Sequence, residues 1–315
     1  MKIPSKEGGR CKLIKQLIER EVIFVWWGFK EVLVITTLGL LGLGEGVKAE
    51  QPALLVEENV EEEKSIEVKV TVIYDNYPLV ESLKTEWGFS CLIEGLEKTI
   101  LFDTGGKGDI LLENMKKLNI NPEKIDIVFI SHDHWDHTGG LASFLQENSR
   151  VEVLLLDSFS PNLKNEVIRS GANLREIKGP SKVCSGAYST GTLGSTIKEQ
   201  SLVIEAEEGL VLITGCAHPG VLDIIRSVKS YYHQDIYLVM GGFHLLDLSL
   251  EKLQEIYKQF RGEDVKKVGP SHCSGDHTRE LFAQKYGQDL VEIGVGKTIS
   301  FPLKLKPRHY NLETN

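Results

Sequence analysis

Cysteine and basic residues are both scarce in this sequence. The 315 residues include five cysteines without a C-x-x-C pair, which excludes a small scaffold stapled by disulfides. Two of them, Cys216 and Cys273, lie within two residues of a candidate ligand histidine, and we interpret both as small buried side chains beside a site. Lysine and arginine number 36 against 45 aspartate and glutamate, a net charge of −9. This acidic balance argues against a nucleic-acid partner.

Internal repeats and long low-complexity tracts are also missing. The composition is 41% hydrophobic and 26% charged, which is typical of a globular protein with one large domain or two small ones.

The first 49 residues differ from the remainder. A basic stretch is followed by an apolar run at 32–43 and by Val47-Lys48-Ala49, which fits signal-peptidase cleavage. We interpret residues 1–49 as a secretory signal, with an uncleaved membrane anchor or a misassigned start codon as alternatives. The protein is then exported or membrane-associated if this segment is real, and cytoplasmic otherwise. Residues 50–66 are predicted to be an acidic linker.

One stretch, Ser-His-Asp-His-Trp-Asp-His-Thr-Gly-Gly at 131–140, concentrates the chemistry. It follows a β-branched and aromatic run at 127–130, so it is expected on a loop at the carboxyl end of a buried strand. His132 and His134 are two residues apart and would point toward one ion from an extended segment. Asp136 and His137 are adjacent and diverge, so this pair can face a second ion. Imidazole with carboxylate suits zinc, iron or manganese.

Periodicity predicts the remaining elements. Strands are expected at 67–74, 89–94, 99–102, 127–130, 151–156, 200–206, 209–213, 236–240, 266–269, 290–293 and 298–301, and helices at 109–118, 221–231, 248–260 and 276–286. Residues 158–195 are Gly/Ser-rich, and no element is assigned there. The two blocks of strands and helices predict an α/β fold with sheet packed on sheet and helices outside.

Six of the nine histidines follow predicted strands, and loops converging on one face would bring them together. They are His132, His134, His137, His218, His244 and His272. Together these motifs resemble the metallo-β-lactamase superfamily over most of residues 67–301. The resemblance implies an αββα four-layer sandwich of two mixed sheets flanked by helices, as one domain at 67–303 with a tail at 304–315.

The resemblance also implies two divalent metal ions, with zinc in first place and manganese, iron or magnesium as alternatives. The implied first site is His132, His134 and His218, and the implied second site is Asp136, His137 and His272. Asp103, which ends an early predicted strand, would orient the histidine loop.

One motif departs from the superfamily pattern. Where a bridging aspartate is usual, this chain has Gly241-Gly242-Phe243-His244-Leu245. Either His244 replaces the aspartate as a ligand, or it faces substrate and the bridge is only water; Asp247 is a substitute further along the chain. We take His244 as a candidate acid or substrate contact, Trp135 and Phe243 as substrate-binding, and Asp136 as a ligand that also handles a proton.

Further motifs look like one subgroup, named after 7,8-dihydropterin-6-yl-methyl-4-(β-D-ribofuranosyl)aminobenzene-5′-phosphate synthase. They include Glu86-Trp87-Gly88-Phe89-Ser90, Thr214-Gly215-Cys216-Ala217-His218-Pro219-Gly220 and Pro270-Ser271-His272-Cys273. That name implies a transferase with a metal-bound diphosphate leaving group, and Trp135, Phe243 and Tyr77 are aromatics available to a pterin.

We therefore expect a metal-dependent hydrolase that activates water against a small-molecule ester, phosphoester or lactone. The subgroup's transferase reaction is the alternative, and a non-catalytic metal-binding sensor is the second alternative. The oligomeric state is left open.

Overall fold

The computed structural model describes residues 66–304. The interpretation of residues 1–49 as a signal or anchor, nearly all of the linker at 50–66 and most of the tail at 304–315 lie outside the described residues. Between residues 66 and 304, no helix has both the length and the apolar character needed to cross a bilayer.

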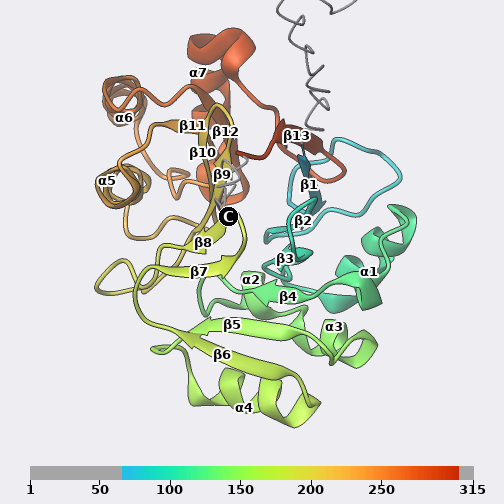
Figure 1. Cartoon of the computed structure of the whole chain (residues 1–315). Helices are drawn as coiled ribbons and strands as arrows, with labels where there is room; N and C mark the ends of the chain where they lie inside the picture. The colour runs from blue at the N-terminus through green and yellow to red at the C-terminus, as the bar shows by residue number, and fades with distance from the viewer. Residues whose placement is uncertain (1–65, 305–315) are drawn as a thin grey trace, which may run out of the picture. The chain divides into compact units, whose positions relative to one another are not determined.

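The first sheet has seven strands in the order β13-β1-β2-β3-β4-β5-β6 (Figure 1). Their bounds are β1 Glu67–Tyr74, β2 Ser90–Glu94, β3 Ile100–Phe102, β4 Ile127–Phe129, β5 Glu152–Leu156, β6 Asn173–Ile177 and β13 Thr298–Pro302. Pairing is antiparallel from β13 to β3 and parallel from β3 to β6, so the sheet is mixed.

The second sheet has six strands in the order β12-β11-β10-β9-β8-β7. Their bounds are β7 Ser181–Cys184, β8 Ala187–Ser189, β9 Leu202–Ala206, β10 Gly209–Thr214, β11 Ile236–Gly242 and β12 Lys267–Ser271. The three strands β10, β11 and β12 run parallel, and the remaining pairs are antiparallel. This sheet is therefore mixed as well.

Helices cover the outer faces of both sheets (Figure 1). Beside the first sheet lie α1 Gly108–Lys117, α3 Leu141–Glu147 and α4 Pro161–Ser170, and beside the second lie α5 Val221–Tyr232, α6 Leu250–Gly262 and α7 Asp276–Tyr286. Strand β10 shows why its sequence is a continuous apolar run: Leu210 and Leu212 pack with the helices, whereas Val211 and Ile213 join the core shared with the first sheet. This layering confirms the predicted αββα sandwich.

Two regions differ from the sequence prediction. Residues 158–195 contain α4, β6, β7 and β8, and helix α4 has clear end signals, with Ser160 as N-cap, Pro161 in the first turn and Gly171 in the left-handed conformation at its end. The strand predicted at 290–293 is wrong. Within this segment only Leu290 forms a β-bridge, with Val268, and the Val291 N–H donates to the Val268 carbonyl oxygen at 2.8 Å.

Candidate metal centre

The candidate ligand side chains come from loops at the carboxyl ends of strands in both sheets. His132 follows β4 of the first sheet, and His218 follows β10 of the second. Their ring centroids lie 4.7 Å apart. Likewise, His137 in the short helix α2 (Trp135–Thr138) lies with its ring centroid 5.1 Å from that of His272, which follows β12. The centre is therefore assembled across the two sheets.

The first ligand group contains only imidazoles. One ring nitrogen from each of His132, His134 and His218 lies within 4.8 Å of the others. His134 is the N-cap of α2 with an extended backbone, which lets it point to the same place as His132 two residues earlier. The structure thus brings together the three residues that the resemblance implied for the first site.

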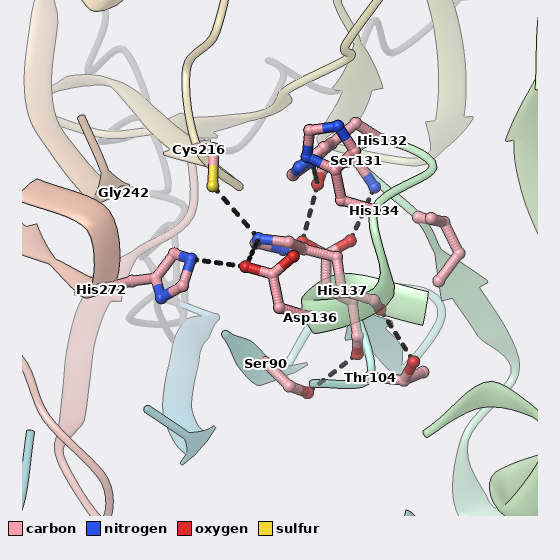
Figure 2. A network of polar contacts seen from close by, with 12 residues as sticks. Ser90, Thr104, Ser131, His132, His134, Asp136, His137, Cys216, Gly242 and His272 are labelled. Carbon is pink, nitrogen blue, oxygen red and sulfur yellow. Dashed lines mark hydrogen bonds and ion pairs between the residues drawn. The ribbon is translucent and has the colours of Figure 1, made fainter. Parts of the chain in front are cut away.

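The second ligand group is mixed in chemistry. Asp136 Oδ2 lies 3.2 Å from His272 Nε2 and 3.5 Å from His137 Nε2. Cys216 joins them, with its Sγ 3.2 Å from His137 Nε2 (Figure 2). All four ligand atoms lie within 4.8 Å of one another. The three residues implied for the second site are together, and the sulfur of Cys216, which we interpreted as a packing residue, lies among them.

Asp103 holds the histidine loop from behind. It directly follows β3 in a left-handed conformation, with φ 52°, and is fully buried. Its Oδ2 accepts hydrogen bonds from His137 Nδ1 and from the Ser131 hydroxyl, both at 2.7 Å, and its Oδ1 accepts from the Ser131 N–H at 2.7 Å. The Ser131 hydroxyl oxygen in turn lies 2.9 Å from His132 Nδ1 and accepts a hydrogen bond from its N–H group. One carboxylate therefore orients a histidine of each ligand group.

Glu199 plays the corresponding part in the second sheet, and the sequence analysis gave it no role. It is fully buried, and its Oε1 accepts the N–H groups of Cys216 at 3.0 Å and Ala217 at 2.8 Å. Its Oε2 accepts the His218 N–H at 2.9 Å and its Nδ1–H at 3.0 Å. Burial alone would raise the pKa of Glu199, but the nearby His132 and these hydrogen bonds hold it below its usual range.

His272 is held by residues that follow β1. Its Nδ1 donates to Asn76 Oδ1 at 3.0 Å, and the Trp87 ring lies against it at a centroid distance of 4.7 Å. The preceding Ser271 hydroxyl donates to the buried Asp75. Nothing local in the sequence links Asn76 to His272, because the two residues are 196 positions apart.

These anchors leave the Nε2 atoms of four histidines facing the centre. With Nδ1 protonated, each Nε2 carries a lone pair, and the Nε2 atoms of His132 and His272 are buried without a hydrogen-bond partner. Burial lowers the pKa of His132 and His137 to about 3, so both rings are neutral at pH 7. A buried lone pair without a partner is costly. A divalent cation would satisfy these atoms, so the residues fit a metal centre.

Asp136 supplies the negative charge of the second group. Burial alone would raise its pKa, but the close approach of the His272 and His137 imidazoles holds it below the usual range. The carboxylate is therefore ionised and available as a ligand or a proton acceptor.

The side chains predicted for catalysis or substrate contact differ in their location and exposure. His244 lies beside the first group, with its ring centroid 4.5 Å from that of His218, and forms a third potential ligand group with Cys216 and Cys273. Trp135 is 60% exposed, so it is not a core residue and can contact a substrate. Asp247 is exposed and joins none of the ligand groups found between residues 66 and 304.

Phe243 requires a correction. Its side chain is 1% exposed and packs against Phe260 and Phe282, at ring-centroid distances of 5.6 and 6.3 Å, in the core beneath the helices. A ring buried there is a packing residue rather than a substrate contact. Among the other aromatics, Tyr77 lies under the Arg279 guanidinium, 3.7 Å from its ring centroid.

Comparison with known proteins agrees with this fold. The model of the metallo-beta-lactamase superfamily matches residues 88–272. A 7,8-dihydropterin-6-methyl-4-(beta-D-ribofuranosyl)-aminobenzene-5'-phosphate synthase of Methanocaldococcus jannaschii is 28% identical over 284 residues, which cover 74% of this chain and 97% of that protein. An N-acyl homoserine lactonase of a Bacillus species is 31% identical over 169 residues, 50% of this chain and 64% of that protein. The solved structure of Tm1679, a metal-dependent hydrolase of the beta-lactamase superfamily, aligns with a TM-score of 0.63 and 26% identity over 74% of this chain and 98% of its own.

Proposed function

This chain belongs to the metallo-β-lactamase superfamily, and from that membership we propose that it is a metal-dependent hydrolase of a small ester, phosphoester or lactone. The observation that carries the proposal is the pair of adjacent ligand groups whose histidines are fixed with Nε2 lone pairs facing inward. A protein without a metal-dependent role has no need to bury such lone pairs unpaired.

Each ligand group would hold one divalent ion. His132, His134 and His218 would hold the first, and Asp136, His137 and His272 the second. Bound divalent ions lower the pKa of water to about 7 and polarise the oxygen of the electrophile. The carboxylates of Asp103 and Glu199 keep the rings in the required tautomer, so the geometry is set before a substrate arrives.

The chain's own groups then manage protons at the site. Asp136 is ionised and can accept a proton from an attacking water. A hydrogen bond with Cys273 raises the pKa of His244, which favours the protonated ring that a general acid requires. His244 lies beside His218, and both His244 and Trp135 are exposed, which supports a role for these two side chains in contacting a substrate.

A transferase of the dihydropterin and aminobenzene-ribotide condensing type is the second candidate. It is favoured by the likeness to the M. jannaschii synthase, which extends over 97% of that protein. Metal ions held by the same two ligand groups would bind the diphosphate leaving group of that reaction. The burial of Phe243 weakens this candidate, because it removes one of three aromatics available to stack on a pterin.

The first test is the metal content of the purified protein, with His137→Ala alongside. We expect about two divalent ions per chain in the parent and about one in the variant, because His137 belongs only to the second group. The parent should also hydrolyse members of a phosphoester and lactone panel, whereas diphosphate release from a pterin diphosphate would identify the transferase instead.

The opposite result is equally clear. Fewer than about one ion per chain in both proteins after metal supplementation would contradict a dinuclear centre. Full metal loading with neither hydrolysis nor diphosphate release would make a metal-binding sensor the leading function.

A further inference from the structure

The sulfur of Cys216 occupies a position that packing alone does not explain. The residue is 4% exposed, yet its Sγ lies 3.2 Å from His137 Nε2 and within 4.8 Å of the ligand atoms of Asp136 and His272. By contrast, Cys91 and Cys184 lie among apolar side chains of the main core, as buried cysteines commonly do. A thiol surrounded by two imidazoles and a carboxylate is in a ligand environment.

The backbone holds this sulfur in place. The Cys216 N–H donates to Glu199 Oε1 at 3.0 Å, and the following Ala217 has a left-handed φ of 61°. The loop is therefore fixed by a buried carboxylate rather than free to move the thiol away.

Gly242 at the end of β11 lies against the same loop (Figure 2). A Cβ at this position would lie 2.3 Å from the Gly215 carbonyl oxygen, 3.1 Å from Cys216 Cα and 2.7 Å from Cys273 Sγ. No side chain can therefore extend from residue 242 toward the centre. In this part of the site the group available to the second ion is the thiol of Cys216.

We propose that Cys216, as its thiolate, is the fourth protein ligand of the second metal ion, with Asp136, His137 and His272. The inference rests on the proposed metal-dependent function and adds the identity of the metal to it. Thiolate sulfur selects zinc, cobalt or iron over magnesium, which prefers oxygen ligands. The second position therefore takes zinc, cobalt or iron, and magnesium does not fill it.

Cys273 provides a matched control. It is also buried and also near the centre, but its Sγ contacts the Cys216 carbonyl oxygen at 3.6 Å, and it is grouped with Cys216 and His244 rather than with Asp136, His137 and His272. Replacing either cysteine by serine removes one sulfur from the same region.

The test is optical and does not depend on activity. The full-length protein is stripped with a chelator and reloaded with Co²⁺, and the near-ultraviolet sulfur-to-cobalt charge-transfer band is recorded. We expect the band in the parent and in Cys273→Ser, and its loss in Cys216→Ser. Titration should show that Cys216→Ser binds the second ion at least about tenfold more weakly, since even residues behind the ligands contribute 10–100-fold.

Several results would overturn the inference. A parent that binds two cobalt ions without the band refutes thiolate ligation while leaving the proposed function intact. Loss of the band in Cys273→Ser but not in Cys216→Ser assigns the sulfur to the other residue. A parent that binds no cobalt refutes the metal centre itself. If circular dichroism shows that Cys216→Ser is unfolded, Cys216→Asp is used instead. We then expect two bound cobalt ions without the sulfur-to-cobalt charge-transfer band.

Discussion

The two sheets each contribute a buried carboxylate behind the metal centre, and the two carboxylates work differently. Asp103 follows β3 of the first sheet and accepts mainly from side chains, the Ser131 hydroxyl and His137 Nδ1. Glu199 precedes β9 of the second sheet and accepts three backbone N–H groups together with His218 Nδ1. Both are fully buried.

The electrostatics separate them further. In the metal-free protein burial raises the pKa of Asp103 to about 8, against the neighbouring His132 and the hydrogen bonds from Ser131, whereas the corresponding contacts hold the pKa of Glu199 below its usual range. Equal burial therefore does not give equal charge; the number of donors aimed at the carboxylate matters as much. Glu199 therefore fixes the course of a loop as well as the tautomer of His218, whereas Asp103 acts on the ring of His137 directly and on the ring of His132 through Ser131.

The largest effect on stability should come from Glu199→Gln. The amide would turn an N–H group toward donors on His218 and leave buried hydrogen bonds unmade, so we expect a loss of about 3 kcal/mol in the free energy of unfolding. Urea denaturation measures it. Glu166→Gln, at an exposed position on α4, is the control and should change stability by less than about 0.5 kcal/mol. Equal losses in the free energy of unfolding for the two variants would contradict a structural role for Glu199.

Asp103→Asn should affect the metal more than the fold. An amide N–H facing His137 Nδ1 would move the ring proton to Nε2 and block the lone pair that serves as ligand. We expect metal affinity to fall by about 10–100-fold, measured by competition with a chromophoric chelator. If Glu199→Gln weakened metal binding more at unchanged stability, the assigned roles of the two carboxylates would be reversed.

The two carboxylates should also give stability opposite pH dependences in the metal-free protein. Asp103 has a folded pKa of about 8 against an ordinary value of 3.8, so the folded state binds the extra proton, and its contribution declines as pH rises from about 4 to about 8. The depressed pKa of Glu199 gives stability that is present above pH 4.5 and lost as pH falls below it. The free energy of unfolding of the parent and of Asp103→Asn is measured by urea denaturation at pH 5 and at pH 8, and the difference between the two proteins isolates the contribution of Asp103. The same difference at both pH values would contradict the prediction.

The smallest effect is expected for Asn76→Ala. It removes the acceptor of His272 Nδ1 and frees only one ring, so we expect about tenfold weaker binding of the second ion. The first ion should bind as before, because His132, His134 and His218 do not contact Asn76. Stepwise metal titration distinguishes the two ions, and equal weakening of both would show that Asn76 supports the whole centre instead.

The sequence by itself determined the fold class and the ligand candidates. Alternating and continuous apolar runs are set by which faces are buried, so strands such as β1 and β10 could be predicted from local pattern. The stretch from His132 to His137 is dense enough to indicate a metal centre without any tertiary information. Its resemblance to the metallo-β-lactamase superfamily supplied the pairing with His218 and His272.

Only the tertiary structure decided which groups stand behind and beside those ligands. Glu199 meets His218 across 19 residues, and Asn76 meets His272 across 196, distances over which no periodicity carries information. Phe243 was misjudged because the strand-end position of a residue does not reveal which way its side chain points, and for the same reason the sequence could not show that the sulfur of the buried Cys216 lies beside His137. Burial and hydrogen-bond satisfaction depend on what the other sheet places opposite, and that is fixed only when the two sheets pack.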